Sequence, residues 1–225
     1  NYGVNDLRLL APLRGLASAR MFEITQRRYA ETALLRSQEI VDSNPNSKRT
    51  DRAQVLVDLG DFYTITSDKR GKETYLSAWA ILQETPGTQQ LASSLFDSPL
   101  RLYPRESPFL FLDRTPDGVT PGVELFADLQ YDISPDGRVQ GIEIIDKNVP
   151  NKGVRLLRQI FRASRYRPRI QDGELVSTEA VQSRQLFAVL YKKPLPDNPQ
   201  EAPADPPIEP LLLLEEPPAE AAPEA

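Results

Sequence analysis

The sequence predicts an α+β protein in which a helical region precedes a small antiparallel sheet that carries one helix. Three observations lead to this fold class. Apolar residues recur at helical spacing over residues 6 to about 84. After residue 122, apolar and polar residues alternate with a period of two, as in half-buried strands. Two Asp-Gly pairs, at residues 136–137 and 172–173, are typical of tight β-turns.

The first half of the helical region is expected to contain two helices. Leucines at helical spacing predict the first, with breaks at Pro12 and Gly15. Residues 21–42 form a long amphipathic stretch that predicts the second helix. The pair Asn44-Pro45 is expected to end it.

The second half of the helical region is expected to contain two more helices. Thr50 or Asp51 is expected to cap the third helix, because short polar side chains bond free backbone N–H groups at a helix start. A break at residues 67–68 leads to the fourth helix. Trp79, on this last helix, is expected to lie in the core.

These last two helices resemble a tetratricopeptide repeat, a hairpin in which small and large residues alternate along the helix contact. The residues that carry the resemblance are Leu56, Leu59, Gly60, Tyr63, Gly71, Tyr75, Ala78 and Pro86. Gly60 and Ala78 are expected to let the helices approach, with Tyr63 and Tyr75 filling the space between them. The resemblance implies a helical-hairpin domain over residues 1–86 with a peptide-binding groove. Any four helices with alternating small and large residues would give the same pattern.

Residues 87–121 contain five prolines and are expected to be irregular. The run SPLRLYPRESPFLFLDRTP within this segment is too apolar for a free linker. We therefore expect an extended strap that packs across one or both neighbouring domains.

Residues 122–193 predict the order β-β-α-β, a small sheet with a helix laid across one face. The expected strands cover residues 123–133, 138–145 and 186–191, and the expected helix covers residues 152–164. Gly137 can take the positive φ that an Asp-Gly turn needs. Pro168 is expected to stop the helix, and Tyr166 to pack under the sheet.

The motifs of this segment, YDISPDGRVQGIEII, a helix, RYRPRIQDGELV and a closing apolar strand, resemble the C-terminal domain of the TonB family. The resemblance covers about seventy residues, on the scale of a small domain. In that family the sheet engages a short receptor peptide by strand addition, so the resemblance implies the same here. TonB proteins also have an N-terminal membrane anchor that this sequence does not show, so we do not expect energy transduction.

The residue composition argues against an enzyme. The chain has no Cys and no His, which removes the thiolate nucleophile, the commonest general base and the commonest metal ligands. No paired carboxylates or other catalytic constellation stands out in the sequence. We expect a non-catalytic protein without cofactor or metal.

The charge is distributed unevenly along the chain. The 225 residues carry a net charge of −5, yet residues 194–225 hold eight acidic residues and no Lys or Arg. The body over residues 1–193 therefore carries +3. This acidic, Pro-rich tail is expected to be disordered when free and to repel nucleic acid. Its one apolar cluster is expected to dock on a partner and consists of Leu211, Leu212, Leu213 and Leu214.

Two further features bear on the location of the protein. No run of about 18 apolar residues occurs, so no membrane span is expected. The chain starts at Asn1 rather than Met, and a cleaved secretory signal is the favoured explanation. A chain trimmed for another reason would start in the same way.

Two surfaces of the sheet region are candidate partner-binding sites. The first is a basic stripe on the helix and just after it, formed by Arg155, Arg158, Arg162, Arg165, Arg167 and Arg169. It suits an acidic peptide, a glycan carboxylate or the protein's own tail, although a charged stripe is most often a solvated helix face. The second is the edge of the closing strand, at Leu186 and Leu190. The strap before Gly122 could equally cover that edge.

These observations favour an exported adaptor of a Gram-negative envelope that binds protein partners. The expected contacts are the helical-repeat groove, strand addition at the sheet and the docking motif of the tail. The alternative is a structural subunit of an envelope or extracellular assembly, in which the tail of one copy contacts the next.

Overall fold

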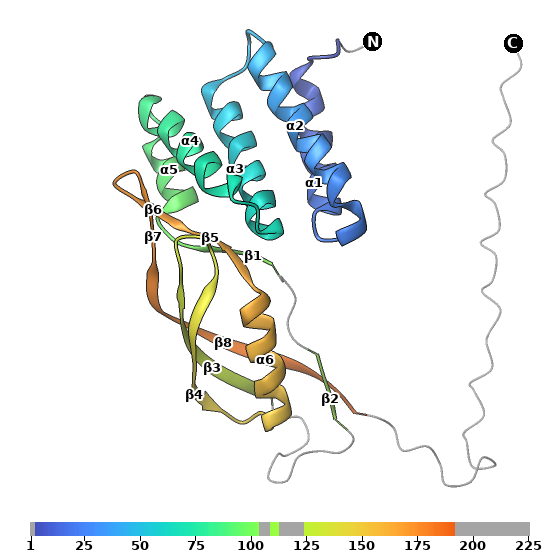
Figure 1. Ribbon diagram of the computed structural model, residues 1–225, viewed down its shortest axis with the longest axis vertical. Helices are drawn as coiled ribbons and strands as arrows, with labels where there is room; N and C mark the ends of the chain where they lie inside the picture. The colour runs from blue at the N-terminus through green and yellow to red at the C-terminus, as the bar shows by residue number, and fades with distance from the viewer. Residues whose placement is uncertain (1–2, 104–108, 113–123, 192–225) are drawn as a thin grey trace, which may run out of the picture.

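The computed structural model describes residues 3–103, 109–112 and 124–191, and it confirms the α+β class (Figure 1). The tail over residues 194–225 lies outside the described residues. In chain order the elements are η1 (Leu7–Leu9), α1 (Leu10–Arg20), η2 (Ile24–Gln26), α2 (Arg27–Ser43), α3 (Arg49–Thr66), α4 (Arg70–Glu84), α5 (Gln89–Phe96), β1 (Leu100–Tyr103), β2 (Phe109–Leu112), β3 (Leu125–Ile133), β4 (Val139–Lys147), α6 (Asn151–Ala163), β5 (Arg165–Arg167), β6 (Arg169–Gln171), β7 (Glu174–Val176) and β8 (Thr178–Tyr191).

The first two helices differ from the expectation at their starts. The expected breaks at Pro12 and Gly15 are wrong, because α1 runs through both residues. Pro12 falls in the first turn of α1, where a missing N–H costs no helical hydrogen bond. The second helix begins at Arg27 rather than at residue 21, after the short η2 turn. It ends at Ser43, and the following Asn44 is extended, as the Asn-Pro pair predicts.

The start of α3 corrects the predicted cap. Neither Thr50 nor Asp51 precedes the helix, since Lys48 is the N-cap residue. Asp51 instead sits in the first turn, and its carboxylate accepts the Lys48 N–H at 3.1 Å. The break at residues 67–68 is confirmed, with Ser67 at φ 60° in the left-handed region that ends many helices.

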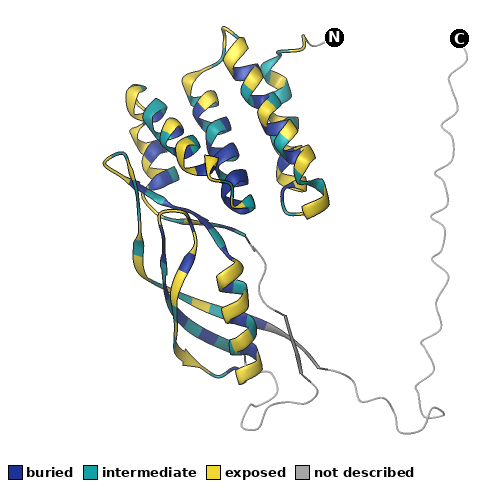
Figure 2. Cartoon of the chain, viewed as in Figure 1, coloured by how far each residue is buried: buried dark blue, intermediate teal, exposed yellow. Residues whose placement is uncertain are grey.

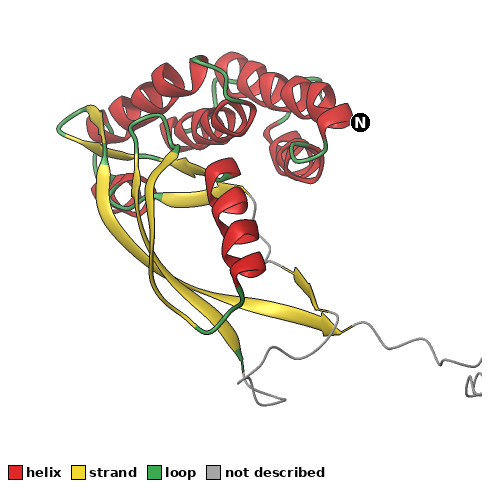
Figure 3. Cartoon of the chain, turned by 60° about the horizontal axis from the view of Figure 1, so that its bottom comes forward, coloured by secondary structure: helices red, strands yellow, loops and turns green. Residues whose placement is uncertain are grey.

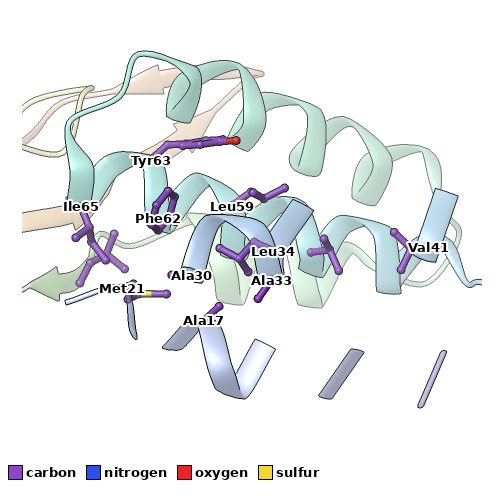
Figure 4. Packing of buried hydrophobic residues seen from close by; sticks show 12 residues of the cluster. Ala17, Met21, Ala30, Ala33, Leu34, Val41, Leu59, Phe62, Tyr63 and Ile65 are labelled. Atoms are coloured by element: carbon purple, nitrogen blue, oxygen red, sulfur yellow. The ribbon is translucent and has the colours of Figure 1, made fainter. Parts of the chain in front are cut away.

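Helices α3 and α4 pack closely at the position of Gly60. A Cβ atom at Gly60 would lie 2.4 Å from Cε1 of Tyr75, a ring that is 1% exposed. The close approach that the alternation of small and large residues predicts is therefore present. Helices α1, α2 and α3 share an adjoining cluster that includes Ala17, Leu34 and Phe62 (Figure 4).

The segment over residues 87–121 is more regular than expected. It forms the helix α5 and the strands β1 and β2 among the described residues. Leu102 of β1 is buried in the cluster of α1, α2 and α3, and the Tyr103 ring stacks on Phe22 at 5.9 Å. In the sequence, the five prolines fall between or outside these three elements. They are therefore compatible with a helix and two strands in this segment.

In the described residues, the main sheet contains four strands in the order β2-β8-β3-β4, and two smaller sheets pair β1 with β5 and β6 with β7. Strand β3 runs antiparallel to both β4 and β8, whereas β2 pairs with β8 in parallel. Helix α6 packs on one face of the sheet, and α1 to α5 gather beyond one end of it (Figures 1 and 3). The face of α6 that points away from the sheet is exposed to solvent (Figure 2).

The predicted alternation of β3 is confirmed. Its residues alternate between buried and half-buried along all nine positions. The buried side meets Leu157 and Phe161 of α6 in one core. Tyr166 lies in the same core, where its hydroxyl is 3.0 Å from that of Tyr131, so its expected place under the sheet is confirmed.

The closing strand is longer than predicted. Strand β8 begins at Thr178 rather than at Leu186, and the short strands β5, β6 and β7 precede it. The β6–β7 turn has Asp172 at φ 50° and Gly173 at φ 82°, as an Asp-Gly turn requires. Polar residues along residues 178–185 hid this part of the strand from a search for apolar runs.

Trp79 is only partly buried, and it packs on the core cluster that joins α3, α4 and α5 to β6. That cluster also contains Ile170 of β6. A Cβ atom at Gly173 would lie 3.4 Å from the Trp79 ring. The expectation of a core position is thus met in part, and Trp79 contacts the hairpin of the sheet region.

The packing at Gly60 yields a paired test. Gly60→Ala is expected to cost about 1–3 kcal/mol of unfolding free energy, because the new methyl group overlaps the buried Tyr75 ring. Gly15→Ala, in α1 with no atom within 4 Å of the added Cβ, is expected to stabilise by up to about 1 kcal/mol. Urea unfolding measures both. Equal effects of the two substitutions would show that helix propensity rather than the α3–α4 contact decides the result.

Candidate functional site

The six arginines of the predicted basic stripe do not form one surface. Arg155, Arg158 and Arg162 are exposed on α6, as expected. Arg165 is half-buried, and its guanidinium donates to Ser67 on the helical side at 3.3 Å. The expectation is wrong for Arg167, which is buried, and Arg169 is only half-exposed. The chain after α6 turns back toward the helices as β5 and β6, which removes these arginines from the stripe.

Arg167 forms a buried ion pair with Asp61 of α3. Its Nε and Nη2 atoms donate to the two carboxylate oxygens at 2.9 and 2.6 Å, a bidentate arrangement. The two side chains are 7% and 15% exposed. The Tyr75 hydroxyl donates to the same carboxylate at 2.8 Å. This pair therefore connects α3 and α4 to β5, across 106 residues of sequence.

The electrostatics of this pair follow from its burial. Removal from water raises the pKa of the Asp61 carboxyl, while hydrogen bonds from Arg167 and Tyr75 oppose that shift. Burial, and then the Asp61 charge, raises the pKa of Tyr75 well above its ordinary value. The Tyr75 hydroxyl therefore stays protonated and remains a donor to Asp61. Arg167 supplies the positive charge that lets the carboxylate remain ionised inside the protein.

The exposed face of α6 carries positive charge without any acid on the helix. Residues 151–163 contain one lysine, three arginines and no Asp or Glu. Arg155, Arg158 and Arg162 form no ion pair with any carboxylate in the described part of the chain. Arg158 and Arg162 are four residues apart, so their charges repel on adjacent turns. We call these three arginines the α6 arginine face.

Two shallow depressions border the α6 arginine face. One is lined by Arg155, Arg158, Gln159 and Arg162. The other, of about 190 Å³, lies between Arg158 and Arg162 on one side and β4 on the other. An acidic group seated in either depression would contact two or three guanidinium groups.

The second predicted site, the edge of β8, is partly covered. Strand β2 pairs in parallel with the end of β8, and Leu190 lies opposite Phe111 in that register. The strap before Gly122 therefore covers the edge at residues 188–191, which was the alternative left open by the sequence. Leu186 lies before this covered part and is 40% exposed.

Residues 181–187 of β8 present the most regular edge of the sheet. They pair with β3 over seven consecutive positions without a register shift, from Leu125 opposite Phe187 to Tyr131 opposite Val181. Within the described ranges these residues have no strand partner on their second side. An edge of this kind leaves backbone N–H and C=O groups available to another chain.

The third predicted site, Leu211 to Leu214 of the tail, lies outside the described residues. Asp61 was not among the predicted site residues, although it flanks Gly60 in a mostly apolar stretch of α3. An acid placed among buried residues is a signal of a buried partner. Nothing in the sequence indicated that this partner lies in β5.

Comparison with known proteins gives no assignment. No protein-family model matches the chain, and no curated protein matches it. In the described parts of the chain, no helix has the length and apolar character needed to cross a membrane. Those same parts hold no group of three or more Asp or Glu placed to bind a metal ion.

The Asp61–Arg167 pair can be tested by removing one partner. Arg167→Met is expected to cost about 3–5 kcal/mol of unfolding free energy, because it leaves a buried carboxylate without a counter-ion. Arg52→Met on the same helix α3 is the control, since its pair with Asp42 is about half exposed, and it should change stability little. Urea unfolding of the variants measures both. Adding Asp61→Asn to Arg167→Met should recover stability, and a further loss would contradict the account.

The same variant predicts a pH dependence. Without Arg167, burial raises the pKa of Asp61 further above its ordinary value of 3.8. When the pKa of an acid is higher in the folded state than in the unfolded state, its ionisation destabilises the folded state. This loss of stability is complete above the folded-state pKa and absent below the unfolded-state pKa. The stability difference between wild type and Arg167→Met should therefore shrink as the pH falls from 7.5 toward 4. A difference that stays constant or grows at low pH contradicts this assignment, and Asp61→Asn/Arg167→Met should show no such change.

Proposed function

We propose that this protein is a non-catalytic adaptor that holds an extended segment of a partner protein by strand addition at residues 181–187 of β8. The observation that supports this most strongly is the uninterrupted seven-residue pairing with β3 on one side, with no strand partner on the second side among the residues that the structure describes. Backbone hydrogen bonds of an added strand supply affinity, and alternate side chains supply specificity.

The other edge of the sheet is less suited to this role. Strand β4 pairs with β3 through two register shifts, and Gly141, its third residue, takes φ 59°. Bulges twist an edge and interrupt the row of available backbone groups. Glu143 and Asp146 add charge to that edge. The comparison of the two edges favours β8 as the acceptor of a partner strand.

The α6 arginine face is proposed as the second contact, for acidic residues of the same partner. Four cations and no acid on one helix lower its intrinsic stability, and Lys152 and Arg155 stand near the positive end of the helix dipole. A helix kept at this cost is consistent with a surface selected for binding. The acidic tail of the chain is a competing ligand of the same charge.

The TonB-like and tetratricopeptide-like resemblances belong to this proposal. In line with them, we propose a location in the periplasm or envelope of a Gram-negative cell. The proposal gives the helical groove a smaller role than the sheet, because Leu102 and Tyr103 of β1 already pack against α1, α2 and α3.

Strand addition makes a specific prediction for peptide binding. Ten-residue peptides selected from a displayed library against the full chain should protect alternate backbone amides within residues 181–187 from hydrogen exchange. The control is the same peptide N-methylated at alternate amides, which keeps its side chains and loses its ability to pair. Binding that survives N-methylation, or that protects only helical amides, would rule out strand addition.

We predict that removing one arginine of the α6 arginine face raises the stability of the protein and weakens its binding of acidic peptides. Arg158→Glu is expected to raise the unfolding free energy by about 0.2–0.5 kcal/mol, because it replaces a repulsive pair with an attractive one at spacing four. The same change should weaken binding of an acidic peptide, such as residues 194–225 supplied separately. Glu substitution at Lys48, outside α6, is the control for net charge. Unchanged peptide affinity in Arg158→Glu would refute a binding role for the face.

A second candidate function is a structural subunit of a larger assembly. The observation that favours it is the group of exposed apolar residues on α1, η2 and α2. Leu16, Ile24, Tyr29 and Leu35 are 44%, 78%, 62% and 43% exposed. Light scattering on the full chain separates the two candidates, because only an assembly subunit associates as its concentration rises.

A further inference from the structure

A cleft between the helical region and the sheet contains more positive than negative groups. It has a volume of about 240 Å³ and lies where the α3–α4 turn meets the β3–β4 turn and β5. We call it the junction cleft. Its charged lining residues are Lys69, Lys72, Arg138, Arg165, Asp68 and Asp136. Cations therefore outnumber carboxylates by two.

Both carboxylates of the junction cleft already have partners. The Asp68 side chain accepts the Arg70 backbone N–H at 2.9 Å and its Nη2 at 2.6 Å. Asp136 pairs with Arg138 at 2.9 Å. Lys69 and Lys72 form no ion pair with a described carboxylate. The cleft is thus left with positive charge that nothing in the described chain neutralises.

Among the described residues, the hydrogen bonds that Arg165 donates all go to neutral groups, and Asp136 acts on it only through its charge. Its Nη1 atom donates to the last carbonyls of α6, with the shortest bond to Ser164 O at 2.9 Å, and Nε and Nη2 donate to Ser67 Oγ at 3.3 Å. Burial, and then the nearby Arg138 charge, lowers the pKa of Arg165. An anion in the cleft would remove this electrostatic cost.

The first turn of α4 adds to the positive electrostatic potential of the junction cleft. Gly71 and Lys72 line the cleft and belong to the start of this 15-residue helix. The start of a helix carries partial positive charge. Asp68 already accepts the N–H groups of Arg70 and Gly71, at 2.9 and 3.2 Å, so the helix start contributes its dipole to the cleft. The cleft thus combines a helix start with side-chain cations from three other elements of the chain.

We propose that the junction cleft binds a doubly charged oxyanion of the phosphate class, held by Lys69, Lys72, Arg138 and Arg165. The cleft is wide enough for a phosphate that carries a small organic group. Because the α3–α4 turn and the β3–β4 turn both contribute cations, a bound anion fastens the helical region to the sheet. This site is separate from β8 and from the α6 arginine face, so it does not depend on the proposed adaptor role.

The test is a titration of the full chain with inorganic phosphate at constant ionic strength, monitored by backbone amide NMR. Saturable shifts are expected at Gly71, Lys72 and Gly137, which lie in or beside the two turns. Lys72→Gln and Arg138→Gln should each weaken binding about tenfold, as expected for loss of a hydrogen bond to a charged group. Arg155→Gln, on the α6 arginine face, is the matched control and should leave the affinity unchanged.

Three results would overturn the proposal. The first is an equal response to chloride at the same ionic strength, which indicates general screening. The second is an affinity that Lys72→Gln and Arg138→Gln leave unchanged. The third is tighter binding of succinate than of phosphate in a parallel titration, which would assign the cleft to carboxylates. Thermal melts of both variants should match wild type in the absence of phosphate. This control shows that any loss of binding does not result from misfolding.

Discussion

The ion pair between Asp61 and Arg167 is the contact on which the arrangement of this protein depends. It is bidentate, nearly buried and tied to Tyr75, so it brings α3, α4 and β5 to one point. Its cost in desolvation is offset only when both partners are present. The β1–β5 pairing and the cluster around Ile170 and Trp79 lie beside it. The two regions therefore meet over a continuous contact rather than through a linker.

This junction determines what the remaining surfaces can do. By drawing β5 and β6 toward the helices, it leaves three arginines on α6 and sets Arg165 at the edge of the junction cleft. Strand β1 of the strap adds to this contact, because its Leu102 is buried among the helices while the strand pairs with β5. The edge of β8 at residues 181–187, which has no strand partner in the described parts of the chain, lies away from these contacts. Under the proposals above, partner segments bind at the sheet, and the junction cleft binds an anion.

Local signals in the sequence predicted local structure well. Alternation predicted β3, the Asp-Gly pairs predicted both turns, and the small residue Gly60 predicted the close contact of α3 and α4. Local signals failed at Pro12, Gly15 and the start of α3, whereas the errors at Arg167 and β8 arose where a long-range contact decides the structure. Arg167 has the same local sequence features as an exposed arginine, and only its partner 106 residues away buries it. Strand β8 was predicted too short, because its polar half is stabilised by pairing with β3 rather than by its own apolar pattern.

The central claim is that the helical region and the sheet form one cooperative unit held at Asp61 and Arg167. Native-state hydrogen exchange on the full chain tests it directly, because it reports the opening free energy of each element separately. The account predicts that the slowest amides of α3 and of β3 open with the same free energy and the same dependence on denaturant. Two clearly different opening free energies, one for the helices and one for the sheet, would contradict it.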